Sequence, residues 1–157
     1  YAAFQSKEAL FRATLDRYAD RMTAEMAALI ARSPSPLQAL QEHLEGLADL
    51  TPCNRPSTAC MLVKSLLEVP QDAALRSFIV AHLDRVEHVI GTALQAAQTA
   101  GELPPQADTA RLARRIQTYI FGLKVQAQRE TDPQRMRELC EDLSAEINRA
   151  RGMPGQA

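Results

Sequence analysis

The amino-acid sequence predicts an all-α protein, and three observations support that fold class. Residues that lose little side-chain freedom on a helix, chiefly Ala, Leu, Gln, Glu and Arg, are plentiful, while aromatic residues make up only 4% of the chain. Apolar residues recur every three or four positions along most of the chain, which is the period of one helix face. Prolines and glycines stand between these stripes, and no segment shows the alternating pattern of a β-strand.

The first helix is expected to begin at its N-cap Ser6 and to run to about Arg32. Residues 33–36, Ser-Pro-Ser-Pro, end it, because proline cannot continue a helix and also restrains the residue before it. A second helix opens with Ser35 as its cap and Pro36 in its first turn. Apolar stripes support both helices, at Phe11, Leu15, Tyr18, Met22, Met26 and Leu29 in the first and at Leu37, Leu40, Leu44 and Leu47 in the second.

Cap residues also mark the start of the remaining helices, at Ser57, Asp72, Asp108 and Asp132. The breakers between them are a loop over 51–56, Pro70, Gly101 with Pro104 and Pro105, and finally Gly152. Gly101 suits the left-handed backbone conformation that commonly ends a helix, here the long one from about Asp72 to Ala100. The apolar stripe of that long helix consists of Leu75, Ile79, His82, Val86, Ile90, Ala93 and Ala97. The pattern therefore predicts six helices in all.

Length, charge and hydropathy exclude several classes of protein. With 157 residues the chain can bury a core without disulfides or metals, and its net charge of −1 argues against a nucleic-acid binder that uses its whole surface. No stretch approaches the roughly 18 consecutive apolar residues of a membrane span, and nothing resembles a secretory signal. We therefore expect a cytoplasmic protein without a membrane partner.

The cysteines predict neither a disulfide framework nor a metal site. Cys53, Cys60 and Cys140 are odd in number, form no CxxC pair and have no histidine at ligand spacing. No acid–base, nucleophile or metal set appears at a recognisable spacing either. We therefore expect no catalytic residues and no cofactor, and a helical enzyme is the least favoured function.

Residues 1–11 have the pattern of the end of one helix, a tight turn and a capped second helix. Apolar residues on both sides of the turn would clamp the two helices together, and Ser6 would cap the second one. Lys7 then lies in the first turn, although a helix N-terminus already carries partial positive charge and prefers acids. A DNA phosphate would relieve that conflict, because the free backbone N–H groups and the lysine would both point at it.

This segment resembles the junction between the recognition helix and the following long helix in TetR/AcrR-type transcription regulators. The residues that match are Tyr1, Phe4, Ser6, Lys7, Glu8, Leu10 and Phe11. The rest of the chain, with a long helix that ends in Gly-Glu-Leu-Pro and two closing amphipathic helices, is similar in layout to the regulatory domain of that family. The resemblance implies that Tyr1 and Lys7 touch phosphates of operator DNA.

The resemblance also implies a TetR-like helical bundle preceded by the end of a recognition helix. Residues 1–5 would end a helix-turn-helix DNA-binding domain, 6–32 would form the connecting helix, 33–152 the ligand-binding and dimerisation domain, and 153–157 a disordered tail. Most base-reading residues would lie upstream of Tyr1. The chain by itself is therefore expected to dimerise but to have no useful operator affinity.

In this family the two closing helices pair with those of a second subunit, which implies a homodimer. The residues expected at or beside the interface are Leu112, Ile116, Tyr119, Leu123, Met136, Leu139, Leu143 and Ile147. The same stripes would also serve the core of a single chain, and that alternative stays open. The family's small-molecule pocket lies among the middle helices, where the candidate contacts are Cys60, Lys64, Phe78, His82 and Phe121.

Two of these candidates have a second interpretation. Near a helix start and one turn from Lys64, the Cys60 thiol would favour its thiolate form and sense oxidants or electrophiles. A free cysteine also commonly fills core space. His82 lies on an apolar stripe, where a hydrogen-bonded core histidine is favoured over a ligand contact.

The sequence therefore predicts a TetR-like, ligand-responsive transcription regulator. Repression is the family default, so we expect a repressor that leaves operator DNA when a small-molecule effector binds the helical core. A helical dimerisation or adaptor module without a DNA role is the main alternative, and it leaves Lys7 at a helix start unexplained. The second alternative is a redox or electrophile sensor that acts through Cys60.

Overall fold

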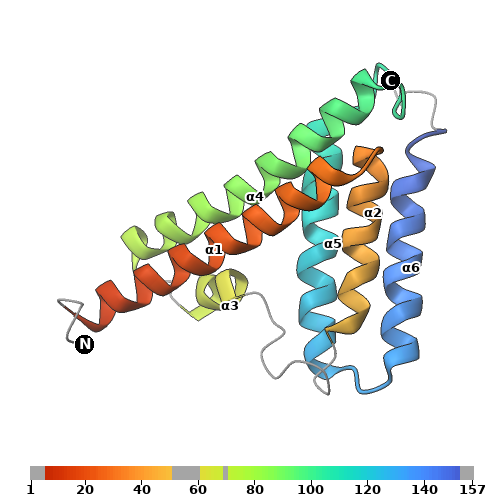
Figure 1. Ribbon diagram of the computed structural model, residues 1–157. Coiled ribbons are helices and arrows are strands. Elements are labelled where there is room, and N and C mark those ends of the chain that lie inside the picture. Colours follow the sequence, from red (N-terminus) through yellow and green to blue (C-terminus); the bar gives the residue numbers. More distant parts are fainter. Residues whose placement is uncertain (1–5, 51–60, 69–70, 153–157) are drawn as a thin grey trace.

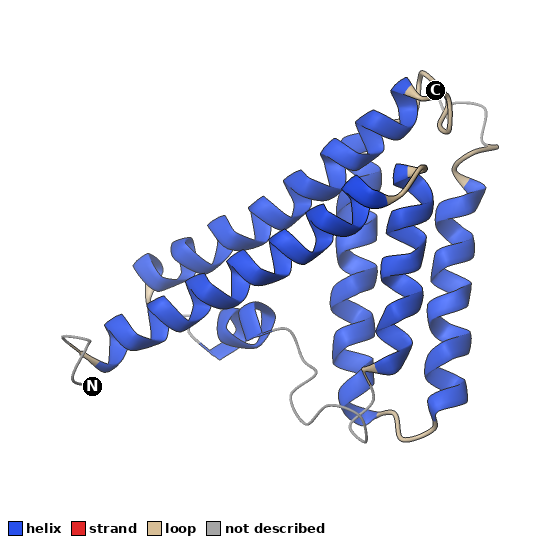
Figure 2. Ribbon diagram, viewed as in Figure 1, coloured by secondary structure: helices blue, strands red, loops and turns tan. Residues whose placement is uncertain are grey.

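The structure is a computed structural model, and it describes residues 6–50, 61–68 and 71–152. All regular elements in these ranges are helices (Figure 2). In chain order they are α1 (Lys7–Arg32), α2 (Pro36–Gly46), the short 3-10 helix η1 (Leu47–Asp49), α3 (Met61–Glu68), α4 (Ala73–Thr99), α5 (Thr109–Arg129) and α6 (Pro133–Arg149). The all-α fold class is therefore confirmed.

The helices form a long arm joined to an upright bundle (Figure 1). α1 and α4 run side by side along the arm, and α3 packs against both of them. α2, α5 and α6 stand together in the bundle, where α4 also packs against α5 and α2. The first turn of α1 consequently lies at the tip of the arm, away from the bundle.

Side-chain caps begin the helices where the sequence predicts them. In each cap a side-chain oxygen accepts a hydrogen bond of 2.9–3.1 Å from a backbone N–H of the first turn. The capping residues are Ser6, Ser35, Asp72, Asp108 and Asp132. Each such cap contributes about 1 kcal/mol to stability. Gly101 has a φ of 80°, which confirms the left-handed position after α4, whereas the expected cap Ser57 lies outside the described residues.

Two apolar clusters hold the fold together. The larger one, here called the bundle cluster, lies where α2, α4, α5 and α6 meet and includes Leu40, Ile90 and Ile116. The smaller one, here called the arm cluster, lies between α1, α3 and α4 and consists of Leu15, Ala19, Leu62, Leu75, Ile79 and Leu83. The apolar stripe expected on α4 is buried along its whole length. α4 therefore contributes to both clusters and connects the arm to the bundle.

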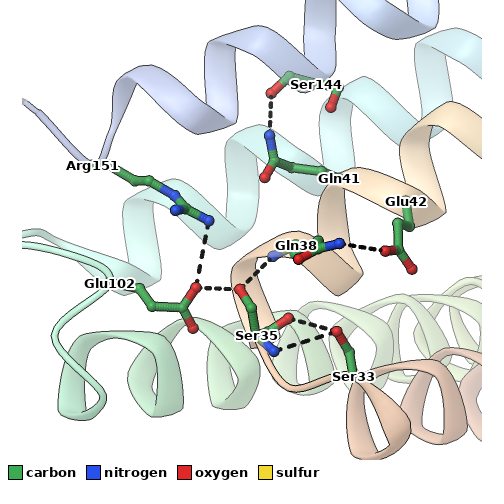
Figure 3. A network of polar contacts seen from close by, with 8 residues as sticks. All are labelled: Ser33, Ser35, Gln38, Gln41, Glu42, Glu102, Ser144 and Arg151. Atoms are coloured by element: carbon green, nitrogen blue, oxygen red, sulfur yellow. Dashed lines mark hydrogen bonds and ion pairs between the residues drawn. The ribbon is translucent and has the colours of Figure 1, made fainter.

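A polar network joins the turn between α1 and α2 to two other segments (Figure 3). The Ser35 hydroxyl donates to the carboxylate of Glu102, in the turn after α4, and Arg151, after α6, donates to the same oxygen at 3.5 Å. Ser35 Oγ also accepts from the backbone N–H of Gln38, and the Ser33 hydroxyl donates to the Ser35 carbonyl. The C-terminal end of α1 is thereby tied to the end of the bundle where these segments meet.

Candidate functional site

A cavity of about 700 Å³ opens between α1, α2 and α5. This volume is typical of pockets that bind small molecules. α1 contributes one wall, with lining residues from Tyr18 to Arg32, and α2 with η1 contributes another, from Glu42 to Leu50. Lys124 of α5 completes the lining. The cavity therefore lies where the arm meets the bundle (Figure 1).

Solvent exposure divides the lining into an inner wall and a rim. The inner wall is buried or half-buried and consists of Tyr18, Met22, Leu29, His43, Leu47, Leu50 and Lys124. The rim is exposed, and its charged residues are Arg21, Glu25, Arg32, Glu42 and Asp49. Water and salt screen charges at the rim, so the chemistry of the inner wall decides which class of ligand is held most tightly.

His43 of α2 brings an unsatisfied polar atom to the inner wall. Its Nε2 atom is buried and forms no hydrogen bond within the part of the chain that the structure describes. Burial, reinforced by the Lys124 ammonium and partly opposed by the Glu25 carboxylate, lowers the pKa of His43 to about 4. The ring is therefore neutral at pH 7, and its buried nitrogen is costly to leave without a hydrogen bond.

Lys124 of α5 is the buried charge of the inner wall, with 7% of its surface exposed. Its Nζ atom donates to the Sδ atom of Met22 on α1 at 3.4 Å. Lys124 therefore brings a cation to the inner wall of the cavity.

A second polar arrangement lies along the seam between α1 and α4. His82 is 7% exposed, and its Nε2 atom lies 2.7 Å from Asp16 Oδ1. Arg85 Nη2 donates to Asp20 Oδ1 at 2.7 Å, about one turn further along both helices. The Phe78 ring meets His82 edge-on, with 4.8 Å between the ring centroids. These contacts favour the interpretation of His82 as a core histidine, because its ring already has a hydrogen-bond partner.

The other expected ligand contacts lie near the arm cluster. Phe78 and Phe121 are half-buried against that cluster, and Lys64 is exposed on α3. Cys60 lies outside the described residues. The lining of the cavity includes none of the candidates whose positions are described, His82 among them. Their role as ligand contacts stays a prediction.

Sequence patterns single out neither His43 nor Lys124 as a site residue, although each interrupts an apolar helix face. His43 stands between Leu40 and Leu47 on one face of α2, and Lys124 stands one turn after Ile120 on α5. A polar residue on an apolar helix face must find a hydrogen-bond partner when it is buried. A ligand is one such partner, so a polar residue that interrupts an apolar stripe is a candidate ligand contact.

Lys7 occupies the first turn of α1 and is exposed at the tip of the arm. The helix start that the sequence predicts here is confirmed by the Ser6 cap. Glu8 follows and pairs with Arg12, with 3.1 Å between Oε1 and Nε. Tyr1 lies outside the described residues. Phosphate contacts by Tyr1 and Lys7 stay predictions.

Much of the apolar surface expected at a dimer interface already lies in the core of one chain. The buried members of that set are Leu112, Ile116, Leu123, Met136 and Ile147. The half-buried members, packed against the bundle cluster, are Tyr119, Leu139 and Leu143. The outer face of α5 carries further apolar surface at Val125, which is 53% exposed and lies close to the exposed Gly122. Dimerisation itself stays a prediction.

The described ranges show no sign of a metal site or a reactive thiol. No group of three or more His, Cys, Asp and Glu side chains in them is placed to hold a metal ion. Burial raises the pKa of the Cys140 thiol to about 11, and the Glu141 and Glu45 carboxylates add to the effect. That thiol is therefore protonated and unreactive at neutral pH. Within the same ranges no helix is long and apolar enough to cross a membrane.

The chain is similar to one protein family and to two individual regulators. The family described as tetracyclin repressor-like, C-terminal domain, matches residues 36–143. The HTH-type transcriptional repressor ComR of Escherichia coli (strain K12) is 26% identical over 142 residues, which cover 89% of this chain and 68% of that protein. A solved structure of the TetR family transcriptional regulator CifR, a cysteine mutant complexed with 26bp double-strand operator DNA, has a TM-score of 0.80 and 25% identity. That match covers 92% of this chain and 76% of the other.

Proposed function

Because the chain belongs to the tetracyclin repressor-like (TetR) family of transcription regulators, we propose that it is the effector-binding and dimerising part of a repressor. In this proposal α1 leads to a DNA-binding head at its N-terminal end. A small molecule in the cavity between α1, α2 and α5 then releases that head from operator DNA. The cavity carries the proposal, because α1 itself forms one of its walls.

The geometry of α1 explains how a ligand in the cavity would act at a distance. The C-terminal end of α1 is tied to the bundle through Ser35, Glu102 and Arg151. From there α1 extends over 26 residues to Lys7, which is about 39 Å at about 1.5 Å per residue. A rotation of about 5° around the tied end would therefore move the first turn by about 3 Å. A slight tilt of α1 is enough to change the spacing of two DNA-binding heads.

The two regulators support DNA as the partner. CifR is complexed with operator DNA, and ComR is named as an HTH-type repressor. In this chain Lys7 is exposed at the start of α1, where it would meet a phosphate together with backbone N–H groups of the first turn. Paired heads must match half-sites about one helical turn apart, or a multiple of that. A changed spacing between the heads would therefore lower operator affinity.

The second subunit in this proposal is a copy of the same chain, packed on α5 and α6. Val125 is one of two large apolar side chains that the described residues expose, and the nearby Gly122 leaves room for another helix. The two helices expose charges of both signs: α5 carries Arg111, Arg114 and Arg115, and α6 carries Glu138, Glu141 and Asp142 besides Arg135, Arg137 and Arg149. A twofold arrangement that sets α5 against the α6 of the other subunit would bring the arginines of α5 close to the acids of α6.

A tryptophan at Gly46 tests the release mechanism. Gly46 lines the cavity, and an added Cβ there meets no atom within 4 Å, so a larger side chain can start from this position without a clash at its Cβ. The indole would occupy the cavity and hold α1 in its ligand-bound orientation. We expect Gly46→Trp to weaken operator binding by about 5- to 150-fold, the usual range for coupling between two sites. The measurement is fluorescence anisotropy of the protein that carries this chain, on DNA selected from a random pool.

Ala96→Trp, on the exposed face of α4 and outside the cavity, is the matched control and should bind DNA like the wild type. The 157 residues contain no native tryptophan, so the emission maximum of each variant, measured on this chain alone, reports whether its indole is buried. Leu29→Trp, on the α1 side of the inner wall, repeats the test if the indole at position 46 stays in water. A buried indole with unchanged operator affinity would contradict the proposal. Failure to select any DNA would favour the adaptor alternative.

A further inference from the structure

The Nε2 atom of His43 is a polar atom of the inner wall that lacks a hydrogen bond. It is buried and has no partner among the residues whose positions are described. The ring is neutral at pH 7, because burial lowers the pKa of His43 to about 4. A neutral imidazole nitrogen either donates or accepts a hydrogen bond, and burying it without one is costly. A ligand that supplies this hydrogen bond would remove the cost.

The place of His43 in the wall lets a ligand reach this atom. His43 belongs to the lining of the cavity and is half-buried there. Its Nε2 atom is covered from water, so a ligand meets that atom only after the ring turns about the Cβ–Cγ bond. That torsion is soft, because it joins a tetrahedral carbon to a planar one. A ligand with a hydrogen-bonding group can therefore draw the nitrogen into the cavity.

The charges of the lining balance each other. Within the described part of the chain, the lining carries equal numbers of cationic and acidic side chains: Arg21, Arg32 and Lys124 against Glu25, Glu42 and Asp49. Arg21 pairs with Glu25, with 2.9 Å between Nε and Oε1. Lys124, the buried cation, donates to Met22 Sδ and is engaged further within the chain. The cavity therefore offers neither an anion nor a cation a net opposite charge.

Apolar side chains make up most of the remaining inner wall. They are Met22, Leu29, Leu47 and Leu50. The affinity that such a wall gives rises with the apolar area that a ligand covers. A charged group brought against it would lose hydration, which is costly unless an opposite charge replaces the water. The wall therefore favours an apolar body without a charge.

From this arrangement, and resting on the effector site proposed above, we infer that the effector is an uncharged, largely apolar molecule with a hydroxyl group that binds His43. A hydroxyl both donates and accepts, so it can pair with Nε2 in either tautomer of the ring. The body of the molecule lies against the four apolar residues of the inner wall. His43 is the residue that selects the hydroxyl group.

Three probes with the same aromatic body test the absence of charge: 2-naphthol, 2-naphthoate and 2-naphthylmethylammonium. Their dissociation constants for the chain are measured by equilibrium dialysis at pH 7, with the ligand quantified by absorbance. We expect 2-naphthol to bind at least about tenfold more tightly than either ion, because it alone enters without losing the hydration of a charge. Equal or tighter binding of either ion would overturn the inference, and so would the absence of binding by all three.

A histidine variant tests the contact with the hydroxyl. His43→Phe keeps a flat ring but removes both nitrogens, and 2-methylnaphthalene replaces the hydroxyl of 2-naphthol with a methyl group. The ratio of the two dissociation constants cancels changes of shape that affect both probes. His43→Phe should shift this ratio about tenfold against 2-naphthol, because the hydroxyl loses its hydrogen-bond partner.

His88→Phe is the matched control, since His88 is exposed on α4 outside the lining, and it should keep the ratio of the wild type. His43→Leu repeats the test if the phenylalanine variant does not fold. An unchanged ratio in a folded His43 variant would refute the assignment of His43.

Operator binding separates this inference from the proposed function. The operator affinity of the protein that carries this chain is measured with and without 2-naphthol. Selective binding of 2-naphthol that depends on His43 but leaves operator affinity unchanged would support the inference and contradict the release mechanism. A ratio that His43→Phe leaves unchanged, together with weakened operator binding by Gly46→Trp, would overturn the inference and leave the release mechanism standing.

Discussion

Acidification should destabilise this protein through His43, and the structure sets the size of the effect. The pKa of His43 is about 4 in the folded chain, against an ordinary value of 6.5. Burial is the main cause, so the folded state resists protonation while the unfolded chain accepts the proton. Stability contributed by the neutral ring is therefore complete above pH 6.5 and is lost as the pH falls towards 4.

The magnitude follows from these two pKa values. A drop from 6.5 to about 4 is roughly 2.5 units, which corresponds to about 3 kcal/mol at about 1.4 kcal/mol per unit. Carboxylates titrate in the same range and change the free energy of unfolding as well. The useful quantity is therefore the difference between the wild type and His43→Gln, because the carboxylates are present in both proteins.

Urea unfolding followed by circular dichroism, at several pH values between about 7 and 4, measures this difference. Over that range the free energy of unfolding of the wild type should fall by about 3 kcal/mol more than that of His43→Gln. His88→Gln, which removes an exposed histidine of α4, is the control and should follow the wild type. Protein concentration is held constant, because the unfolding of a dimer depends on it. Equal losses in the wild type and His43→Gln would refute the reasoning, and an NMR titration of the ring would then show the true pKa.

Two further substitutions test the proposed dimer face and the polar network. Because the proposed interface is symmetric, Val125→Glu places two charges in it, one from each subunit. The dimer dissociation constant, measured by analytical ultracentrifugation, should therefore rise at least about tenfold. Leu67→Glu changes the other large apolar side chain that the described part of the chain exposes, and it should leave the dimer intact. Equal behaviour of both variants would contradict the interface. Glu102→Ala removes an acceptor shared by a hydroxyl and a guanidinium, and should lower the free energy of unfolding by about 1 to 2 kcal/mol. Glu68→Ala, on the exposed surface of α3, is the control and should change the free energy of unfolding by less than about 0.5 kcal/mol. An equally small change for Glu102→Ala would show that the network contributes little to stability.

The helices can be predicted from the sequence because their signals are local. The Asp108 side chain bonds to the backbone N–H of Arg111, three residues away, so the cap is visible in the sequence itself. The stripe on α4 needs only the spacing of apolar residues, and Gly101 marks the end of that helix by its backbone freedom. For these features the predicted and observed positions agree.

The cavity is harder to predict, because it depends on how helices cross. Tyr18, His43 and Lys124 come from three helices and meet only because α1 passes over both α2 and α5. Periodicity shows which face of a helix is apolar, but the place where two packed faces leave a gap depends on crossing angle and side-chain shape. The expected ligand contacts Phe78 and Phe121 lie on such apolar faces, but they pack against the arm cluster.

The packing of α1 limits what any ligand in the cavity can do. Beyond the cavity α1 packs on α4 through Leu15 and Ala19, whose separation would expose apolar surface. The nearby ion pair between Arg85 and Asp20 is exposed and is worth at most about 1 kcal/mol. A ligand in the proposed effector cavity would therefore tilt α1 along α4 more easily than it would lift α1 away. To force that tilt, the ligand would have to press on the α1 and α2 walls together.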